Sequence, residues 1–182
     1  MKETVAADRQ LDTQALLKAY ELTINEEHRF LTAHQTHAAF YAGVVTALVA
    51  GTGAGLFNAT EWFHFAFLLS GPALAVGVCA IAVQGLRRQY QRFLEAVTVR
   101  AKLESLLGFT TLTVTSSYWA GESLIPVRYV NSRTAFTSSK EFVSMNLNRG
   151  ANGVSAIFFR CLAGASGLMF FGILGATISR LL

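Results

Sequence analysis

The chain has 182 residues, of which 52% are hydrophobic and only 14% are charged. Soluble domains carry about 25% charged residues, so this composition argues against a soluble fold. The net charge of +4 is too small to indicate a nucleic-acid-binding protein by itself. Cys79 and Cys161 both lie in apolar runs, which is typical of buried free thiols and not of a disulfide framework.

The first part of the chain predicts two helices. Leu11–Glu21 is expected to be a short amphipathic helix, with Asp12 as its N-cap. Thr23–Glu26 has the pattern of a capping box, so a second helix is expected to begin there and to continue to about Phe57. Such a helix is about 51 Å long and exceeds the thickness of a bilayer, so about four of its turns would project from the membrane.

Three apolar runs without a charged residue predict membrane spans. Each run has the roughly 20 residues that a helix needs to cross the hydrocarbon layer. The alternating pattern of a β-barrel is absent, and three such runs in a short chain disfavour the core helices of a soluble bundle. The fold class predicted is an all-α membrane protein with three transmembrane helices, at 38–57, 65–86 and 161–179.

Lysine and arginine are distributed unevenly around these runs. The connection 58–61 contains none, whereas residues 87–160 contain ten and residues 1–37 contain four. By the positive-inside rule, the N-terminus and the long middle segment are cytoplasmic, and the turn at 58–61 lies outside. Arg180, near the outer end of the third span, is an exception whose long side chain can reach the headgroups.

The second span is expected to kink at Gly71-Pro72, because proline removes a helical hydrogen bond. Beyond the membrane it is expected to continue as a cytoplasmic helix, with Arg100 and Glu104 as a pair one turn apart and Gly108 as its terminating residue. The two long helices therefore form a hairpin with cytoplasmic extensions.

The amino-acid composition changes after this helix. Residues 110–115 and 124–130 are rich in β-branched residues and are candidate strands, and Ser138–Glu141 is a capping box for a short helix through Leu147. We expect a small mixed α/β cytoplasmic appendage. The predicted segments of the chain are 1–107 for the N-terminal helix and the membrane hairpin with its stalk, 108–153 for the appendage, and 154–182 for the third transmembrane helix.

The first span carries a ladder of small residues four positions apart. Membrane helices associate closely where small residues let their backbones approach. The ladder is therefore a candidate interface, either with the second span of the same chain or with a neighbouring subunit. Its members are Ala39, Gly43, Ala47, Gly51 and Gly55, with a second ridge at Ala38, Ala42, Thr46, Ala50 and Ala54.

Basic residues follow the second span directly. Arg87, Arg88 and Arg92, together with Glu95, are candidates either for binding anionic lipid or for the inner mouth of a pore. Residues 87–160 have ten basic and four acidic residues, a net charge of +6, which permits RNA or nucleotide binding, although no recognition motif is present.

No catalytic residue, cofactor or metal site is predicted. His34 and His37 lie one turn apart and could hold a metal or titrate near neutral pH, but no third ligand stands at a recognisable spacing. Histidines near the headgroups are the simpler interpretation. The sequence also contains no phosphate-binding loop and no nucleophile elbow.

Two segments resemble a known family. Glu21–Phe30 (ELTINEEHRF) and Tyr90–Lys102 (YQRFLEAVTVRAK), within residues 21–107, resemble the RipA family of octameric bacterial inner-membrane proteins. The resemblance implies a ring-like homo-oligomer in the bacterial inner membrane with a cytoplasmic portion. The general plan also resembles the membrane pore proteins that accompany RNA-targeting CRISPR systems.

These observations lead to two hypotheses about function. The first is a non-enzymatic homo-oligomeric ring among membrane lipids, structural or pore-like, in stress adaptation or antiphage defence. The alternative is a membrane-tethered binding module whose basic cytoplasmic part recruits anionic lipid, nucleotide or RNA.

Overall fold

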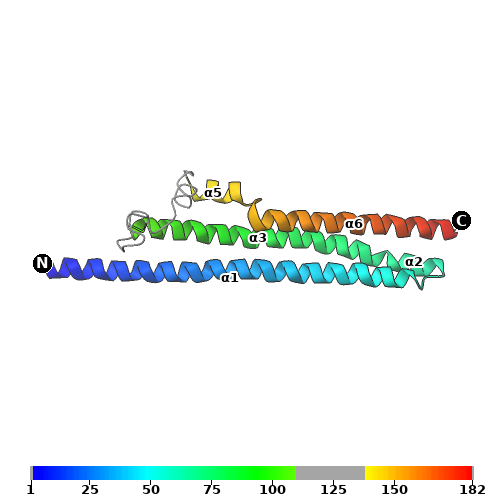
Figure 1. Ribbon diagram of the computed structural model, residues 1–182, viewed down its shortest axis with the longest axis horizontal. Coiled ribbons are helices and arrows are strands. Elements are labelled where there is room, and N and C mark those ends of the chain that lie inside the picture. The colour runs from blue at the N-terminus through cyan, green and yellow to red at the C-terminus, as the bar shows by residue number, and fades with distance from the viewer. Residues whose placement is uncertain (1, 110–137, 182) are drawn as a thin grey trace, which may run out of the picture. The chain divides into compact units, whose positions relative to one another are not determined.

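The computed structural model describes residues 2–109 and 138–181 (Figure 1). The described residues form five helices and no strand, in agreement with the predicted all-α class. The candidate strands at 110–115 and 124–130 lie outside the described residues, so the mixed α/β appendage is not seen. The helices are α1 (Lys2–Leu56), α2 (Trp62–Leu68), α3 (Ser70–Leu106), α5 (Ser139–Asn146) and α6 (Gly150–Leu181).

The first helix, α1, is continuous over 55 residues. The separate helix at Leu11–Glu21 and the N-cap roles given to Asp12 and Thr23 are therefore wrong. Thr23 lies inside the helix, and its hydroxyl donates a hydrogen bond to the Ala19 carbonyl at 2.8 Å. A hydroxyl side chain can make this backward bond without ending a helix, and no Gly or Pro interrupts the chain before Gly43.

The predicted kink at Gly71-Pro72 is a break between two helices. Helix α2 ends at Leu68, and α3 begins at Ser70. Pro72 has no N–H to donate to the carbonyl of Leu68 four residues earlier, and its ring crowds that carbonyl. The Ser70 hydroxyl caps the preceding turn by donating to the Phe67 carbonyl at 2.8 Å.

The ends of α3 and α5 follow the sequence signals. Gly108 has a φ of 75°, and the amide of Phe109 donates to the Glu104 carbonyl at 2.9 Å, which is the glycine-terminated helix end that was predicted. At the start of α5, the Ser138 hydroxyl accepts the amide of Glu141 at 3.2 Å, as the capping box predicts.

The chain divides into two compact units, each of which uses part of α1 and part of α3. Unit 1 comprises Met1–Leu31 and Tyr90–Asn148, and unit 2 comprises Thr32–Gln89 and Arg149–Leu182. In unit 1, Tyr90 and Leu94 of α3 pack against Val143 and Leu147 of α5. In unit 2, the apolar core joins α1, α3 and α6 and consists of Val45, Ala75, Cys79, Ala82, Leu86 and Phe159.

Three stretches of helix in the described part of the chain are long and apolar enough to cross a membrane. They lie within Asp12–Leu56, Trp62–Leu106 and Ser139–Leu181. The second stretch contains α2 and α3, which are separated at Leu69, and the third contains α5 and α6, which are separated before Gly150. Only 11%, 22% and 17% of the most apolar window of these stretches is buried inside the single chain. By length and composition, these three helices are those of a multi-pass membrane protein.

Candidate functional site

Four members of the small-residue ladder form an exposed face on α1. Ala39, Gly43, Ala47 and Gly51 are exposed, and a Cβ atom added to either glycine would meet nothing within 4 Å. The fifth member, Gly55, differs because a Cβ there would press against the side chain of Leu68 in α2. We call the first four residues the small-residue face.

The contact of α1 with α3 in unit 2 uses the other side of α1. Val45 and Thr52 are buried, and a Cβ added to Gly71 of α3 would overlap the Thr52 hydroxyl and lie 3.5 Å from the Leu48 carbonyl. Gly71 is thus the glycine that permits the close approach of these two helices. In the sequence, Gly71 is notable only for the predicted kink, because no local pattern shows which residue of another helix lies opposite it.

The second ridge is divided between these two sides. Ala38 and Ala42 are half-buried and pack against the core of unit 2, whereas the ridge residues farther along α1 are exposed. The exposed members, Thr46, Ala50 and Ala54, widen the strip of small side chains on the surface of α1.

A shallow open groove of about 240 Å³ lies beside the small-residue face. Its hydroxyl groups belong to Thr52 and Ser70, and both are hydrogen-bonded to carbonyls of their own helices or turns. Both hydroxyl hydrogens are therefore used within the chain, and the surface of the groove is mostly apolar. Its lining residues are Ala47, Leu48, Gly51, Thr52, Phe67, Leu68, Ser70 and Gly71.

A charged cluster links α1 and α3 within unit 1. The Arg100 guanidinium donates to Glu27 at 2.7 Å and lies 3.3 Å from a carboxylate oxygen of Glu104, and the Tyr20 hydroxyl donates to Glu104 at 3.4 Å. The side chains of Glu27 and Glu104 are only 8% and 6% exposed. The pair of Arg100 with Glu104 was predicted, whereas the link to Glu27, 73 residues away, was not.

The basic residues after the second apolar run are exposed on α3. Arg87 and Arg88 belong to unit 2, and Arg92 and Glu95 belong to unit 1. Glu95 accepts a hydrogen bond from the Gln91 amide group at 2.8 Å. All four predicted residues are therefore exposed on the surface of the single chain.

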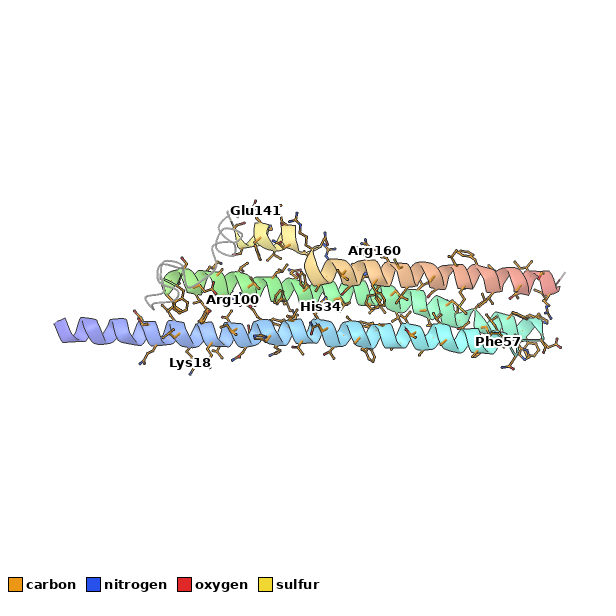
Figure 2. The ribbon with its side chains drawn as sticks, in the orientation of Figure 1. Lys18, His34, Phe57, Arg100, Glu141 and Arg160 are labelled. Carbon is orange, nitrogen blue, oxygen red and sulfur yellow. The ribbon has the colours of Figure 1, made fainter. Side chains whose placement is uncertain are left out.

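Two arginines bracket the uncharged part of α6. Arg160 lies near its start (Figure 2), and Arg180 lies 20 residues later, a separation of about 30 Å along a helix. Arg180 donates to the Thr60 carbonyl at 3.0 Å, and its guanidinium carbon lies 5.4 Å from the centre of the Phe65 ring. The C-terminal end of α6 therefore lies beside the turn that joins α1 to α2.

The histidines and cysteines differ in their surroundings. His34 is only 2% exposed, and this burial lowers the pKa of its ring, whereas His37 is exposed and contacts Gln89 of α3. Among the described residues, no group of three or more His, Cys, Asp or Glu could hold a metal ion. Cys79 is buried as expected, but Cys161 is exposed because it falls on the outer side of α6.

Comparison of the chain with protein-family models, curated proteins and solved structures finds no match. The resemblance carried by Glu21–Phe30 and Tyr90–Lys102 therefore stays a prediction.

Proposed function

We propose that this chain is a non-enzymatic protein of the bacterial inner membrane that assembles into a homo-oligomeric ring, with the small-residue face of α1 as one side of the subunit contact. The observation that carries the proposal is that this face is open. Gly43 and Gly51 have nothing within 4 Å of the position of a Cβ, although α1 packs tightly on α3 through its other side.

The surrounding lipid determines which helix faces associate. Two helices in lipid gain little from covering apolar side chains, so they associate where small residues allow extensive backbone contact. Gly43 and Gly51 have open space where a Cβ would stand, so this face of Ala and Gly, which extends over about three turns, is little used against α3. A neighbouring helix could approach it closely.

A closed ring needs two different surfaces on each subunit, because its contacts are head-to-tail. Helix α6 offers the second surface. Its glycines at 164, 172 and 175 have nothing within 4 Å of an added Cβ, and Leu168 and Phe171 between them are exposed. In the proposed ring, this face of one subunit meets the small-residue face and the adjoining groove of the next.

The subunit contact is tested by enlarging one glycine at a time. Gly43→Leu and Gly51→Leu should both lower the native mass of the detergent-extracted particle, because a leucine side chain separates the helices. Gly77→Leu is the matched control, since Gly77 lies on α3 and is equally open. Native mass spectrometry of the three variants and the wild type measures the subunit number.

The outcome of this experiment is decisive for the ring. An unchanged oligomer in both α1 variants would show that the small-residue face contacts lipid. A wild-type chain that is monomeric over a range of concentrations would instead favour the membrane-tethered binding module.

The pore-like character is a separate part of the proposal. A ring encloses a centre, and charged residues near one end of that centre would set ion selectivity. We assign Arg92 and Glu95 to this position because both are exposed on α3 beyond the second apolar run. Arg92→Glu should shift the currents of the assembled ring in planar bilayers toward cations, and an absence of current from intact rings would remove the pore while leaving the oligomer.

A further inference from the structure

The charges of unit 2 are concentrated toward one end. Unit 2 contains five arginines, no lysine and a single acidic residue, Glu61. Glu61 belongs to the turn between α1 and α2, the same end at which Arg180 binds the Thr60 carbonyl. The remaining arginines, including Arg87, Arg88 and Arg160, have no acidic residue of unit 2 near them in the sequence.

Arg87 and Arg160 lie at the same end of the apolar core of unit 2, although 73 residues separate them in the sequence. Helices α3 and α6 run antiparallel there (Figure 1). Phe159, only 1% exposed, belongs to the same core cluster as Leu86. Arg87 directly follows Leu86, the last core residue on α3, and Arg160 directly follows Phe159, the first core residue on α6. Because the two helices are antiparallel, both arginines stand at the same end of this core.

These arginines stand next to exposed apolar surface, as residues near the headgroups of a membrane do. Arg87, Arg88 and Arg160 are exposed, and on the apolar side of them the exposed surface continues with Ile81 of α3 and Leu168 of α6. A guanidinium group binds a phosphate through two parallel hydrogen bonds, and cationic residues next to a membrane attract anionic lipid.

We propose that Arg87, Arg88 and Arg160 form a collar that binds the phosphate groups of anionic phospholipids in one leaflet. The collar is complete within a single chain, so it does not depend on the proposed ring. The opposite leaflet is not selected in this way, because Arg180 is engaged with the Thr60 carbonyl and the Phe65 ring, and Glu61 lies in the same turn.

The collar is tested by counting bound lipids. Purified wild-type protein in detergent is titrated with phosphatidylglycerol or with phosphatidylcholine of the same acyl chains, and native mass spectrometry records the lipid adducts. We expect a clear preference for phosphatidylglycerol that falls with added salt. The double variant Arg88→Gln/Arg160→Gln should lose about fivefold in this preference for each arginine removed.

Two further variants separate local contact from net charge. Lys18→Gln/Arg149→Gln removes the same charge from exposed positions away from the collar, since Arg149 precedes Arg160 by 11 residues or about 16 Å, and it should keep the preference. Arg88→Lys/Arg160→Lys keeps the charge and should retain most of the preference. Circular dichroism and melting curves verify the fold, and Arg160→Gln alone replaces the double variant if that variant does not fold.

Three results would overturn the collar. The wild type could bind both lipids equally, or the charge-matched control could lose as much preference as the double variant. The third is a loss of binding to a single-stranded oligoribonucleotide in the double variant with an unchanged lipid preference, which would assign these arginines to nucleic acid.

Discussion

Units 1 and 2 join the same two helices in different ways. In unit 1, Arg100 of α3 lies between the carboxylates of Glu27 and Glu104, so a buried charged cluster makes the link. In unit 2, α1 and α3 meet through apolar and small side chains, with the closest approach at Thr52 and Gly71. The contact between α1 and α3 depends on paired charges in unit 1 and on close packing of side chains in unit 2.

Charged and apolar contacts between helices have different physical requirements. A buried carboxylate must be paired, so the position of Arg100 fixes which residues of α1 and α3 lie opposite each other. An apolar contact between helices in lipid has no such requirement and gains from close packing alone. Substitutions should therefore disturb unit 1 through unpaired charge and unit 2 through changed volume.

The largest effect is expected from breaking the charged cluster. Arg100→Met leaves Glu27 and Glu104 without their cation, and we expect a loss of about 3 kcal/mol, the low end for a buried pair because the Arg100 side chain is 24% exposed. The rate of trypsin cleavage at exposed Lys102 should rise accordingly. The triple change Glu27→Gln/Arg100→Met/Glu104→Gln removes every charge and should lose less, and an equal or greater loss would contradict the unpaired-charge explanation.

An intermediate effect is expected from a single methyl group in unit 2. Gly71→Ala places a Cβ against the Thr52 hydroxyl and should destabilise unit 2 by about 1–3 kcal/mol, as overpacking does. Gly77→Ala, in open space on the same helix, should be neutral or slightly stabilising because alanine favours a helix. Thermal unfolding in detergent measures both, and similar melting temperatures for the two variants would argue against the close approach.

The smallest effect is expected from the polar contact at the end of unit 2. Arg180→Gln removes the hydrogen bond to the Thr60 carbonyl and the contact with the Phe65 ring, both at an exposed side chain. We expect a loss of at most about 1 kcal/mol, typical of exposed charged contacts. Arg149→Gln is the control. A loss as large as that of Arg100→Met would mean that charge also dominates in unit 2.

Local features of the structure could be predicted from the sequence. The helix end at Gly108 and the N-cap at Ser138 depend on a few neighbouring residues, and the structure confirms both. The uncharged runs likewise depend only on local composition, and they fall in the helices that are apolar enough to cross a membrane. The capping pattern at Thr23 predicted a helix start that is wrong, because the same residue types also occur inside a helix.

The pairing of residues distant in sequence could not be predicted. Glu27 with Arg100 and Thr52 with Gly71 depend on the relative position and rotation of two long helices, which their separate patterns do not specify. The small-residue ladder was found from its spacing, but only the structure shows that Gly43 and Gly51 have open space where a Cβ would stand. The exposure of Cys161 was missed for the same reason, since an apolar run gives no direction to its side chains.

The spacing of Arg160 and Arg180 suits α6 to a bilayer of one particular thickness. Their separation of 20 residues, about 30 Å, equals the hydrocarbon layer of an average membrane. In a thinner bilayer the helix must tilt, and in a thicker one the lipids must compress around it or the arginine side chains must stretch toward the headgroups. The stability of unit 2 should therefore pass through a maximum as the acyl chains of the surrounding lipid are lengthened.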